Sequence, residues 1–279
     1  MSVVMRIGDA WRQASRRIDR LDARLLLEHV SGCTHADLVA RPEMEMSEEH
    51  SMCLESLVRR RETGEPLAYL VGNAWFCGLE FKVNPAVLIP RQDTEVLVNV
   101  AVEKAKALEK PAIVDLGTGT GIVAVLISRM CPQARLTAVD MSAAALDVAQ
   151  ANGRRYGGSI RFLEGDWYAP LGDERFDIIV SNPPYVVAGD PHLQQNGLPF
   201  EPQQALTDGV AGGDGLACIR RIVDGASGHL RSGGWLLMEH GYDQAVEVRR
   251  RLMEAGFGNV TSWPDGAGIE RVSGGRFDA

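Results

Sequence analysis

From residue 111 to the C-terminus, the sequence alternates between short apolar runs rich in β-branched residues and longer segments with the period of a helix. Chains of this kind form a mostly parallel, doubly wound sheet with helices on both faces. The expected strands are Ala112–Leu116, Leu136–Val139, Ile160–Leu163, Asp177–Ser181 and Trp235–Glu239, followed by an antiparallel pair at Phe257–Trp263 and Ile269–Ser273. The expected helices are Gly121–Met130, Ser142–Asn152, Gly215–Leu230 and Asp243–Ala255. An α/β fold is therefore predicted, with ligands bound at the carboxyl ends of the strands.

The first 75 residues have a different, helical pattern. Apolar residues recur at helical spacing around Leu21 and Leu25, a short helix fits His35–Ala40, and a longer one fits Ser47–Arg61. About three helices of this size form a small bundle, and no catalytic cluster is evident in it. The arginines at 59, 60 and 61 are interpreted as a solvated helix end in preference to a partner contact.

The period changes again between these two parts. Residues 75–89 alternate around Gly78, which is typical of a β-hairpin, and a helix is expected to begin after Pro90. A long segment near residues 186–214 has no clear periodicity, and loops of that length are usually functional or mobile. The expected organisation is a helical domain over residues 1–74, a hairpin linker over 75–90 and an α/β domain over 91–279.

Charge and cysteine usage narrow the class of protein. The chain has 29 basic and 37 acidic residues, and the formal net charge of -8 lacks the excess of Lys and Arg that phosphate backbones favour. No apolar run is long enough to predict a membrane span, and no secretory signal is evident. The five cysteines are widely spaced, and neither CxxC nor HExxH occurs. We therefore expect buried or partly buried free thiols in a reducing cytoplasm, and no metal site.

A glycine-rich loop follows the first strand of the α/β part. It reads Asp115-Leu116-Gly117-Thr118-Gly119-Thr120-Gly121, and it opens the next helix, whose first N–H groups are unpaired. The dinucleotide motif G-x-G-x-x-G requires a glycine where this chain has Ile122. The spacing G-x-G-x-G is commoner in S-adenosylmethionine enzymes. We expect the five residues from Gly117 to Gly121 to bind that cofactor; a tight structural turn is the alternative.

Acidic residues follow the next two strands. Asp140 ends the second strand and can accept hydrogen bonds from both hydroxyls of a ribose, although NAD sites use the same device. Alone, it could instead belong to the N-cap of the helix at Ser142. Asp166 and Trp167 follow the third strand, where an acid can hold the amine of an adenine and an aromatic ring can lie against the base. For this pair, the alternative is a strand-end turn with a packed tryptophan.

The sequence Asn182-Pro183-Pro184-Tyr185 ends the fourth strand. Two prolines remove backbone donors and stiffen the turn, so the Asn182 side-chain oxygen and the Pro183 carbonyl remain as acceptors. These acceptors suit a planar group that carries NH2, on which Tyr185 can stack. Holding both hydrogens stabilises the positive charge that grows on this nitrogen as it attacks a methyl group. Asn182, Pro183 and Tyr185 are the candidate catalytic residues, and all four residues of the box are candidate substrate contacts. Asn182 is also expected to contact the cofactor.

Together these motifs resemble the release-factor glutamine methyltransferases, the HemK/PrmC family. The resemblance covers nearly the whole chain, and Asn-Pro-Pro-Tyr itself is shared with enzymes that methylate amino groups of DNA and RNA. More specific are Leu88-Ile89-Pro90-Arg91, Phe200-Glu201-Pro202 and Glu239-His240-Gly241. Gln92 departs from the family, which often has proline there.

The resemblance implies a helical N-terminal domain, a hairpin linker and a Rossmann-like methyltransferase domain. We expect the helical domain to recognise the substrate, because a glutamine side chain alone offers too few atoms to select one loop. It further implies methyl transfer from S-adenosylmethionine to the side-chain amide nitrogen of the glutamine in the Gly-Gly-Gln loop of class I peptide-chain release factors. A cytoplasmic monomer without direct nucleic-acid contacts is expected. The alternatives are methylation of an adenine or cytosine amino group, a non-catalytic cofactor-binding module, and a nicotinamide oxidoreductase, against which Ile122 argues.

Overall fold

The computed structural model describes residues 5–278, which form two compact units. One unit consists of the chain up to Asn73 together with residues 194–200. The other consists of residues 74–193 and 201–278. The chain therefore passes between the units near residue 74, and again on either side of the short segment Gln194–Phe200. In the part that the structure describes, no helix combines the length and the apolar character needed to cross a membrane.

The first unit is a helical bundle. Its helices are α1 (Ile7–Ala14), α2 (Arg20–Ser31), α3 (His35–Ala40), α4 (Glu48–Glu62) and α5 (Leu67–Val71). Asp19, Thr34 and Ser47 cap α2, α3 and α4 through their side chains, which explains where these helices begin. The expectation of about three helices was too low. The face of α1 that is buried consists largely of small residues, and α5 has only five residues, so neither gives a strong apolar period.

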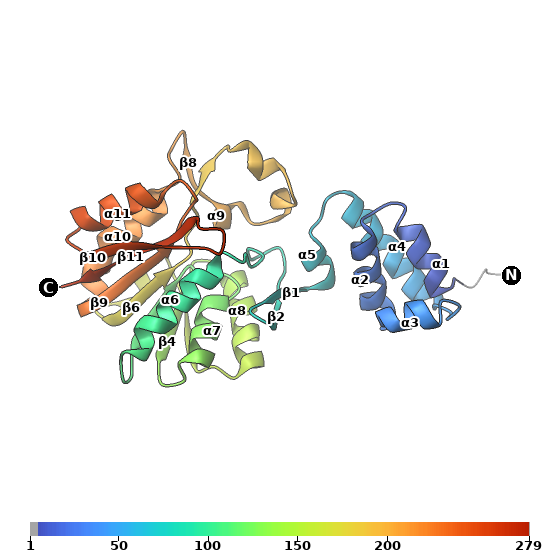
Figure 1. Cartoon of the computed structure of the whole chain (residues 1–279), viewed down its shortest axis with the longest axis horizontal. Helices are drawn as coiled ribbons and strands as arrows, with labels where there is room; N and C mark the ends of the chain where they lie inside the picture. The colour runs from blue at the N-terminus through green and yellow to red at the C-terminus, as the bar shows by residue number, and fades with distance from the viewer. Residues whose placement is uncertain (1–4, 279) are drawn as a thin grey trace. The chain divides into compact units, whose positions relative to one another are not determined.

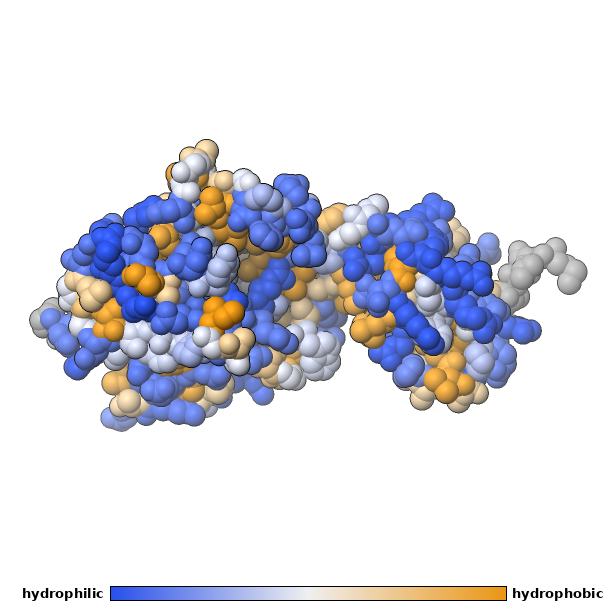
Figure 2. All heavy atoms as spheres, turned by 45° about the horizontal axis from the view of Figure 1, so that its top comes forward, coloured by the Kyte–Doolittle hydropathy of each residue, from blue (hydrophilic) through white to orange (hydrophobic). Residues whose placement is uncertain are grey.

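The surface of the helical unit is rich in ion pairs, and Figure 2 shows a mostly hydrophilic face. Arg59, Arg60 and Arg61 pair with Glu55, Glu65 and Asp22, respectively. These contacts lie within the unit, so the three arginines support the bundle itself. The α2 stripe differs from the expectation at Leu21, which is exposed, whereas Leu26 is buried as its place in the pattern predicts.

The second unit contains a seven-stranded sheet in the order β10-β11-β9-β6-β3-β4-β5. Its strands are β3 (Ala112–Leu116), β4 (Arg135–Asp140), β5 (Ile160–Glu164), β6 (Phe176–Ser181), β9 (Leu230–Glu239), β10 (Gly258–Pro264) and β11 (Glu270–Phe277). The strands from β5 to β9 are parallel, and β11 is antiparallel to both of its neighbours. This arrangement confirms the predicted α/β fold. The order reverses at β3, so the carboxyl ends of β3 and β6 flank the point at which such sheets bind ligands.

Helices cover both faces of this sheet (Figure 1). Successive residues of β3 point to opposite sides: Ile113 packs with helices α6 (Thr94–Lys106) and α7 (Ile122–Met130), whereas Val114 packs with α10 (Ala217–His229). Helix α8 (Ala143–Tyr156) contacts α7, and α11 (Ala245–Glu254) contacts α10. Both sheet faces are therefore buried, which explains why the strands read as continuous apolar runs.

The predicted hairpin is formed by β1 (Asn73–Phe76) and β2 (Leu79–Lys82). The side chain of Asn152 on α8 fixes β2, because its amide accepts from the Lys82 N–H at 2.8 Å and donates to the Lys82 carbonyl at 3.0 Å. Asn152 also donates to the Thr120 carbonyl at 2.9 Å. One buried amide thus joins the hairpin to the glycine loop.

The segment near residues 186–214, in which no periodicity was found, does contain regular structure. Strands β7 (Val186–Ala188) and β8 (Thr207–Ala211) pair in parallel, and α9 (Gln203–Leu206) precedes β8. The pattern is invisible in the sequence because these strands are short and partly exposed. The cysteine prediction was partly wrong: all five thiols are free, but Cys53 and Cys77 are exposed.

Candidate active site

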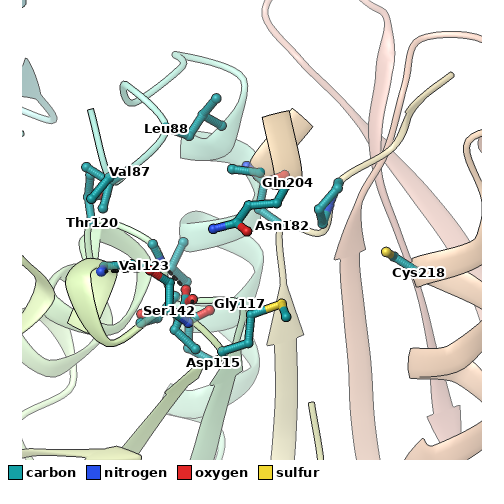
Figure 3. Close-up of a pocket in the computed structure, with 18 of the residues that line it drawn as sticks. Val87, Leu88, Asp115, Gly117, Thr120, Val123, Ser142, Asn182, Gln204 and Cys218 are labelled. Atoms are coloured by element: carbon teal, nitrogen blue, oxygen red, sulfur yellow. Dashed lines mark hydrogen bonds between the residues drawn. The ribbon is translucent and has the colours of Figure 1, made fainter. Parts of the chain in front are cut away.

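A cavity of about 530 Å3 lies within the second unit, at the carboxyl ends of β3, β4, β5 and β6. Figure 3 shows its lining residues converging from several elements: Gly117 and Thr120 from the glycine loop, Ser142 before α8, Asn182 after β6, and Cys218 on α10. The segment that leads to α6 supplies Val87 and Leu88, and α9 supplies Gln204. The volume and the largely apolar lining suit a small organic ligand.

The glycine loop has the backbone that only glycine adopts without strain. Gly117, Gly119 and Gly121 have φ values of 72°, 52° and 78°. A Cβ on Gly121 would lie 3.0 Å from the Cβ of Ala149, so this position also lets the loop pack against α8. A Cβ on Gly119, in contrast, would meet nothing within 4 Å. The backbone at Gly119 is therefore open to the cavity.

Asp115, near the end of β3, holds this loop through its side chain. Its Oδ2 accepts a hydrogen bond of 2.6 Å from the Thr118 hydroxyl, and its residue surface is almost fully buried. Burial raises the pKa of Asp115 to about 7, against the opposing effect of the hydrogen bond from Thr118. The sequence places Asp115 at the start of the loop motif but gives no sign that its carboxyl is buried.

Asp140 lines the cavity at the end of β4. Its Oδ2 accepts from the Gly119 N–H at 2.8 Å, and its Oδ1 accepts from the Ser142 N–H at 2.9 Å. The carboxylate thus joins the glycine loop to the start of α8 and is held in one orientation. Burial raises the pKa of Asp140, and these backbone donors oppose the rise. Each oxygen keeps a second lone pair for a ligand hydroxyl.

Asp166 and Trp167 also line the cavity, after β5. Asp166 forms an ion pair of 2.6 Å with Arg221 of α10, a partner that the sequence did not indicate. Trp167 has a φ of 49°, and its ring lies so close to Gly117 that a Cβ there would be 3.3 Å from Cζ3. Trp167 therefore packs directly on the glycine loop.

The Asn-Pro-Pro-Tyr box follows β6, and its first residue is fixed by α6. The Asn182 Nδ2 donates to the Thr94 hydroxyl at 3.2 Å, so Oδ1 is the side-chain atom that remains for a substrate N–H. Asn182 and Pro184 line the cavity, whereas Pro183 and Tyr185 are not among its lining residues. Pro183 is buried, and the stacking role expected for Tyr185 stays a prediction.

Tyr185 is held at both its backbone and its side chain. Its carbonyl accepts from Gln244 Nε2 at 3.0 Å, and its hydroxyl donates to Glu239 Oε1 at 3.1 Å. Glu239 ends β9, the strand that pairs with β6. Burial raises the pKa of this carboxyl to about 7, and hydrogen bonds from Thr94 and Tyr185 oppose the rise. Burial likewise raises the pKa of the Tyr185 phenol, so this hydroxyl stays a donor at neutral pH.

Glu201 fixes the cavity wall before α6. Its carboxylate accepts from the Ile89 N–H at 3.0 Å and pairs with Arg91, while Pro90 and Arg91 line the cavity. Motif analysis from the residues alone did not identify Thr94, Glu201, Arg221 or Glu239 as parts of the site. For Glu239 a signal existed, because an acid at the end of a buried parallel strand is the same feature that singled out Asp140.

Known proteins with similar sequences match this chain over most of its length. Residues 92–196 match the family described as methyltransferase small domain, and residues 7–72 match the PrmC N-terminal domain. The release factor glutamine methyltransferase of Bordetella pertussis is 48% identical over 259 residues, which span 92% of this chain and 95% of that one. The protein of the same name from Escherichia coli K12 is 42% identical over 260 residues, 92% of each chain.

A solved structure supports the fold independently. A methyltransferase from Pyrococcus furiosus aligns with a TM-score of 0.53 and covers 81% of this chain and 98% of its own. Its sequence identity is only 16%, so this likeness concerns the fold alone.

Proposed function

Because this chain belongs to the family of release factor glutamine methyltransferases, we propose that it methylates the side-chain amide nitrogen of a glutamine in a peptide-chain release factor. The glutamine is that of the Gly-Gly-Gln loop of class I factors. The observation that carries the proposal is the fixed side chain of Asn182: its nitrogen is engaged by Thr94, and its oxygen is left as an acceptor at the cavity. A primary amide presents the matching N–H groups.

The cavity suits S-adenosylmethionine as the methyl donor. Its volume fits a ligand of that size, the open backbone at Gly119 admits close approach, and a fixed carboxylate at Asp140 is available for ribose hydroxyls. Gly117 to Gly121 would hold the amino-acid end, and Trp167 and Asp166 the adenine end. When bound, this cofactor supplies a methyl group that its sulfonium makes electrophilic.

The residues of the box act on the nucleophile. Asn182 Oδ1 and the Pro183 carbonyl each accept one N–H of the substrate amide, which orients the nitrogen toward the methyl group. An amide nitrogen is a weak nucleophile because its lone pair is delocalised. Acceptors on both hydrogens stabilise the positive charge that grows as the lone pair forms the new bond. Preorganised dipoles lower the barrier most when they stabilise charge that develops in the transition state. The proton that the product nitrogen then loses is very acidic, so water suffices to accept it.

The helical unit is the proposed recognition surface, because none of the residues that the structure describes in it lines the cavity. We further propose that the enzyme acts as a cytoplasmic monomer and does not contact nucleic acid directly. The decisive experiment incubates the full chain with an intact class I release factor and isotope-labelled S-adenosylmethionine, followed by mass spectrometry of the factor. We expect one methyl group on the Gly-Gly-Gln glutamine. Label transferred to DNA or RNA in preference to the factor would replace this function by methylation of a base.

A further inference from the structure

Four side chains from three elements connect the two ends of the Asn-Pro-Pro-Tyr box. Asn182 donates to Thr94, and Tyr185 donates to Glu239. The Thr94 hydroxyl also lies close enough to the Glu239 carboxyl to favour its ionised form and lower its pKa. Thr94 and Glu239 are each 1% exposed, so water does not compete for these groups. The mechanism above uses Thr94 only as the partner of the Asn182 nitrogen and gives no role to Glu239.

The chemistry of these groups gives the chain of hydrogen bonds a direction. An ionised carboxylate only accepts, so Thr94 and Tyr185 must both turn their hydrogens toward Glu239. The hydroxyl of Thr94 has a single hydrogen, so its oxygen can then only accept from the side chain of Asn182. Asn182 must therefore present its NH2 to Thr94, which leaves its oxygen for the cavity.

Resting on the methyl transfer proposed above, we propose that Glu239 is a positioning residue. Its carboxylate sets, through Thr94, which end of the Asn182 amide faces the substrate, and it holds Tyr185 at the other end of the box. A side chain at this position that can donate would let Thr94 reverse its hydroxyl. The Asn182 amide could then present NH2 to the substrate amide, which would oppose two donors.

The charges around Glu239 leave its ionisation sensitive to pH. Asp93, on the turn before α6, disfavours the anion, whereas Arg271 of β11 favours it. Arg271 is itself shared between Asp93, at 3.2 Å, and Asp265, at 2.9 Å. The two ring nitrogens of the neighbouring His240 bond to Ser273, at 2.7 Å, and to the Gly241 carbonyl, at 2.9 Å. Oε2 of Glu239 is buried without a close partner of its own among the described residues, and the pKa of about 7 follows mainly from burial.

The test is the pH dependence of turnover in the full-length enzyme, measured with intact release factor at saturating cofactor. Wild type should lose kcat as the pH falls below about 7. Glu239→Gln should lower kcat at pH 8.5 by about 10- to 100-fold, the scale for a misoriented catalytic group, and should abolish this acid limb. The Kd for S-adenosylmethionine, measured by calorimetry, should change less than threefold, because cofactor contacts are not involved.

Two variants at Thr94 keep the test independent of how well Glu239→Gln folds. Thr94→Val preserves the shape but removes the hydroxyl, and should lower kcat to a similar degree. Thr94→Ser retains the hydroxyl and should keep kcat within about threefold of wild type. If Thr94 only supported the fold, kcat would not differ between the two variants in this way. The positioning role is overturned if Glu239→Gln keeps both the turnover and the acid limb, or if Thr94→Val is as active as Thr94→Ser. Failure of wild type to methylate the release factor at any pH would instead reject the proposed function.

Discussion

Arg91 and Glu201 form an ion pair of 2.5 Å whose acidic partner is almost fully buried: the side chain of Glu201 is 1% exposed and that of Arg91 is 37% exposed. The same carboxylate accepts the backbone N–H of Ile89. One side chain therefore holds the segment that lines the cavity ahead of α6, across more than a hundred residues of sequence. Because Glu201 directly follows Phe200, it also marks the point at which the chain re-enters the second unit.

Glu201→Ala should destabilise the enzyme by about 1 to 3 kcal/mol, because it leaves the Ile89 N–H without its acceptor and removes the partner of Arg91, which water can partly replace. Glu201→Gln keeps an acceptor for Ile89 and should cost less. Chemical denaturation of both variants measures the difference. If the two variants are equally stable and match wild type, Glu201 does not fix this wall.

Asn182→Ala should separate binding from chemistry. The cofactor affinity should stay within a few fold, while turnover should fall by about two to three powers of ten, the scale for losing one preorganised polar group. Calorimetry with S-adenosylmethionine and single-turnover methylation of the release factor give the two values. Near-normal turnover would contradict the role of Asn182 as an acceptor for the substrate amide.

Asp140→Ala should show the opposite pattern, with cofactor affinity reduced more than the chemical step. It removes a fixed acceptor for the ribose and also the anchor that holds the Gly119 and Ser142 N–H groups, so cofactor affinity should fall. Asp140→Asn is the matched control, because it retains one acceptor oxygen and a similar shape. Calorimetry measures both, and an unchanged Kd for Asp140→Ala would remove this residue from the cofactor site.

Asp115 should make the cofactor-free enzyme less stable as the pH rises. Its pKa is raised from 3.8 to about 7 in the folded protein, so between these values the unfolded chain has lost a proton that the folded chain retains. Stability from this group therefore falls as the pH rises from about 4 to about 7 and stays low above that range. His240, whose pKa burial lowers, has the opposite dependence.

A comparison of Asp115→Asn with wild type isolates the contribution of Asp115, since His240 is common to both. The variant should gain in Tm relative to wild type at pH 8 and gain less at pH 5. Each unit of pKa difference corresponds to about 1.4 kcal/mol. Thermal unfolding without cofactor provides the measurement, and a Tm difference that is the same at both pH values would exclude a titrating Asp115.

The strands of the α/β core could be predicted because each is marked by a short, continuous run of apolar residues in the sequence. Residues 112–116 were placed without error, since a continuous apolar run bounded by a proline and a glycine loop has few alternatives. Strand β9 begins at Leu230, five residues earlier than expected, because Gly233 and Gly234 read as a turn although they lie within the strand. The pairing of β7 with β8 was missed because no local period marks these short strands.

The residues of the candidate site divide in the same way. The glycine loop, Asp140 and the Asn-Pro-Pro-Tyr box could be found because each directly follows a strand, and the carboxyl ends of parallel strands meet. Their partners could not be found by this rule. Thr94 lies 88 residues before Asn182, and Asp166 is 55 residues from Arg221, so neither contact leaves a trace in local spacing.

Division of labour between the two units provides the last prediction. A glutamine side chain offers too few atoms to select one loop in one protein, so selectivity requires surface remote from the chemistry. A variant lacking residues 1–75 should retain cofactor binding, because all the described residues that line the cavity belong to the second unit. It should lose most of its activity on intact release factor. A Gly-Gly-Gln peptide should be a poor substrate for both forms, and truncation should lower the activity on the peptide only slightly further.

The structure adds a requirement to this experiment. Residues 194–200 pack with the helical unit: a Cβ on Gly197 would lie 2.9 Å from Pro66, and one on Gly64 would lie 3.7 Å from Phe200. Truncation leaves this segment without its packing partners, so turnover must be expressed per molecule of enzyme that binds cofactor. Peptide activity supplies the matched control, since a damaged cavity would lower activity on both substrates, whereas loss of recognition lowers activity on the protein alone. If the truncated form methylates intact release factor as well as the full chain does, the helical unit is not the recognition surface.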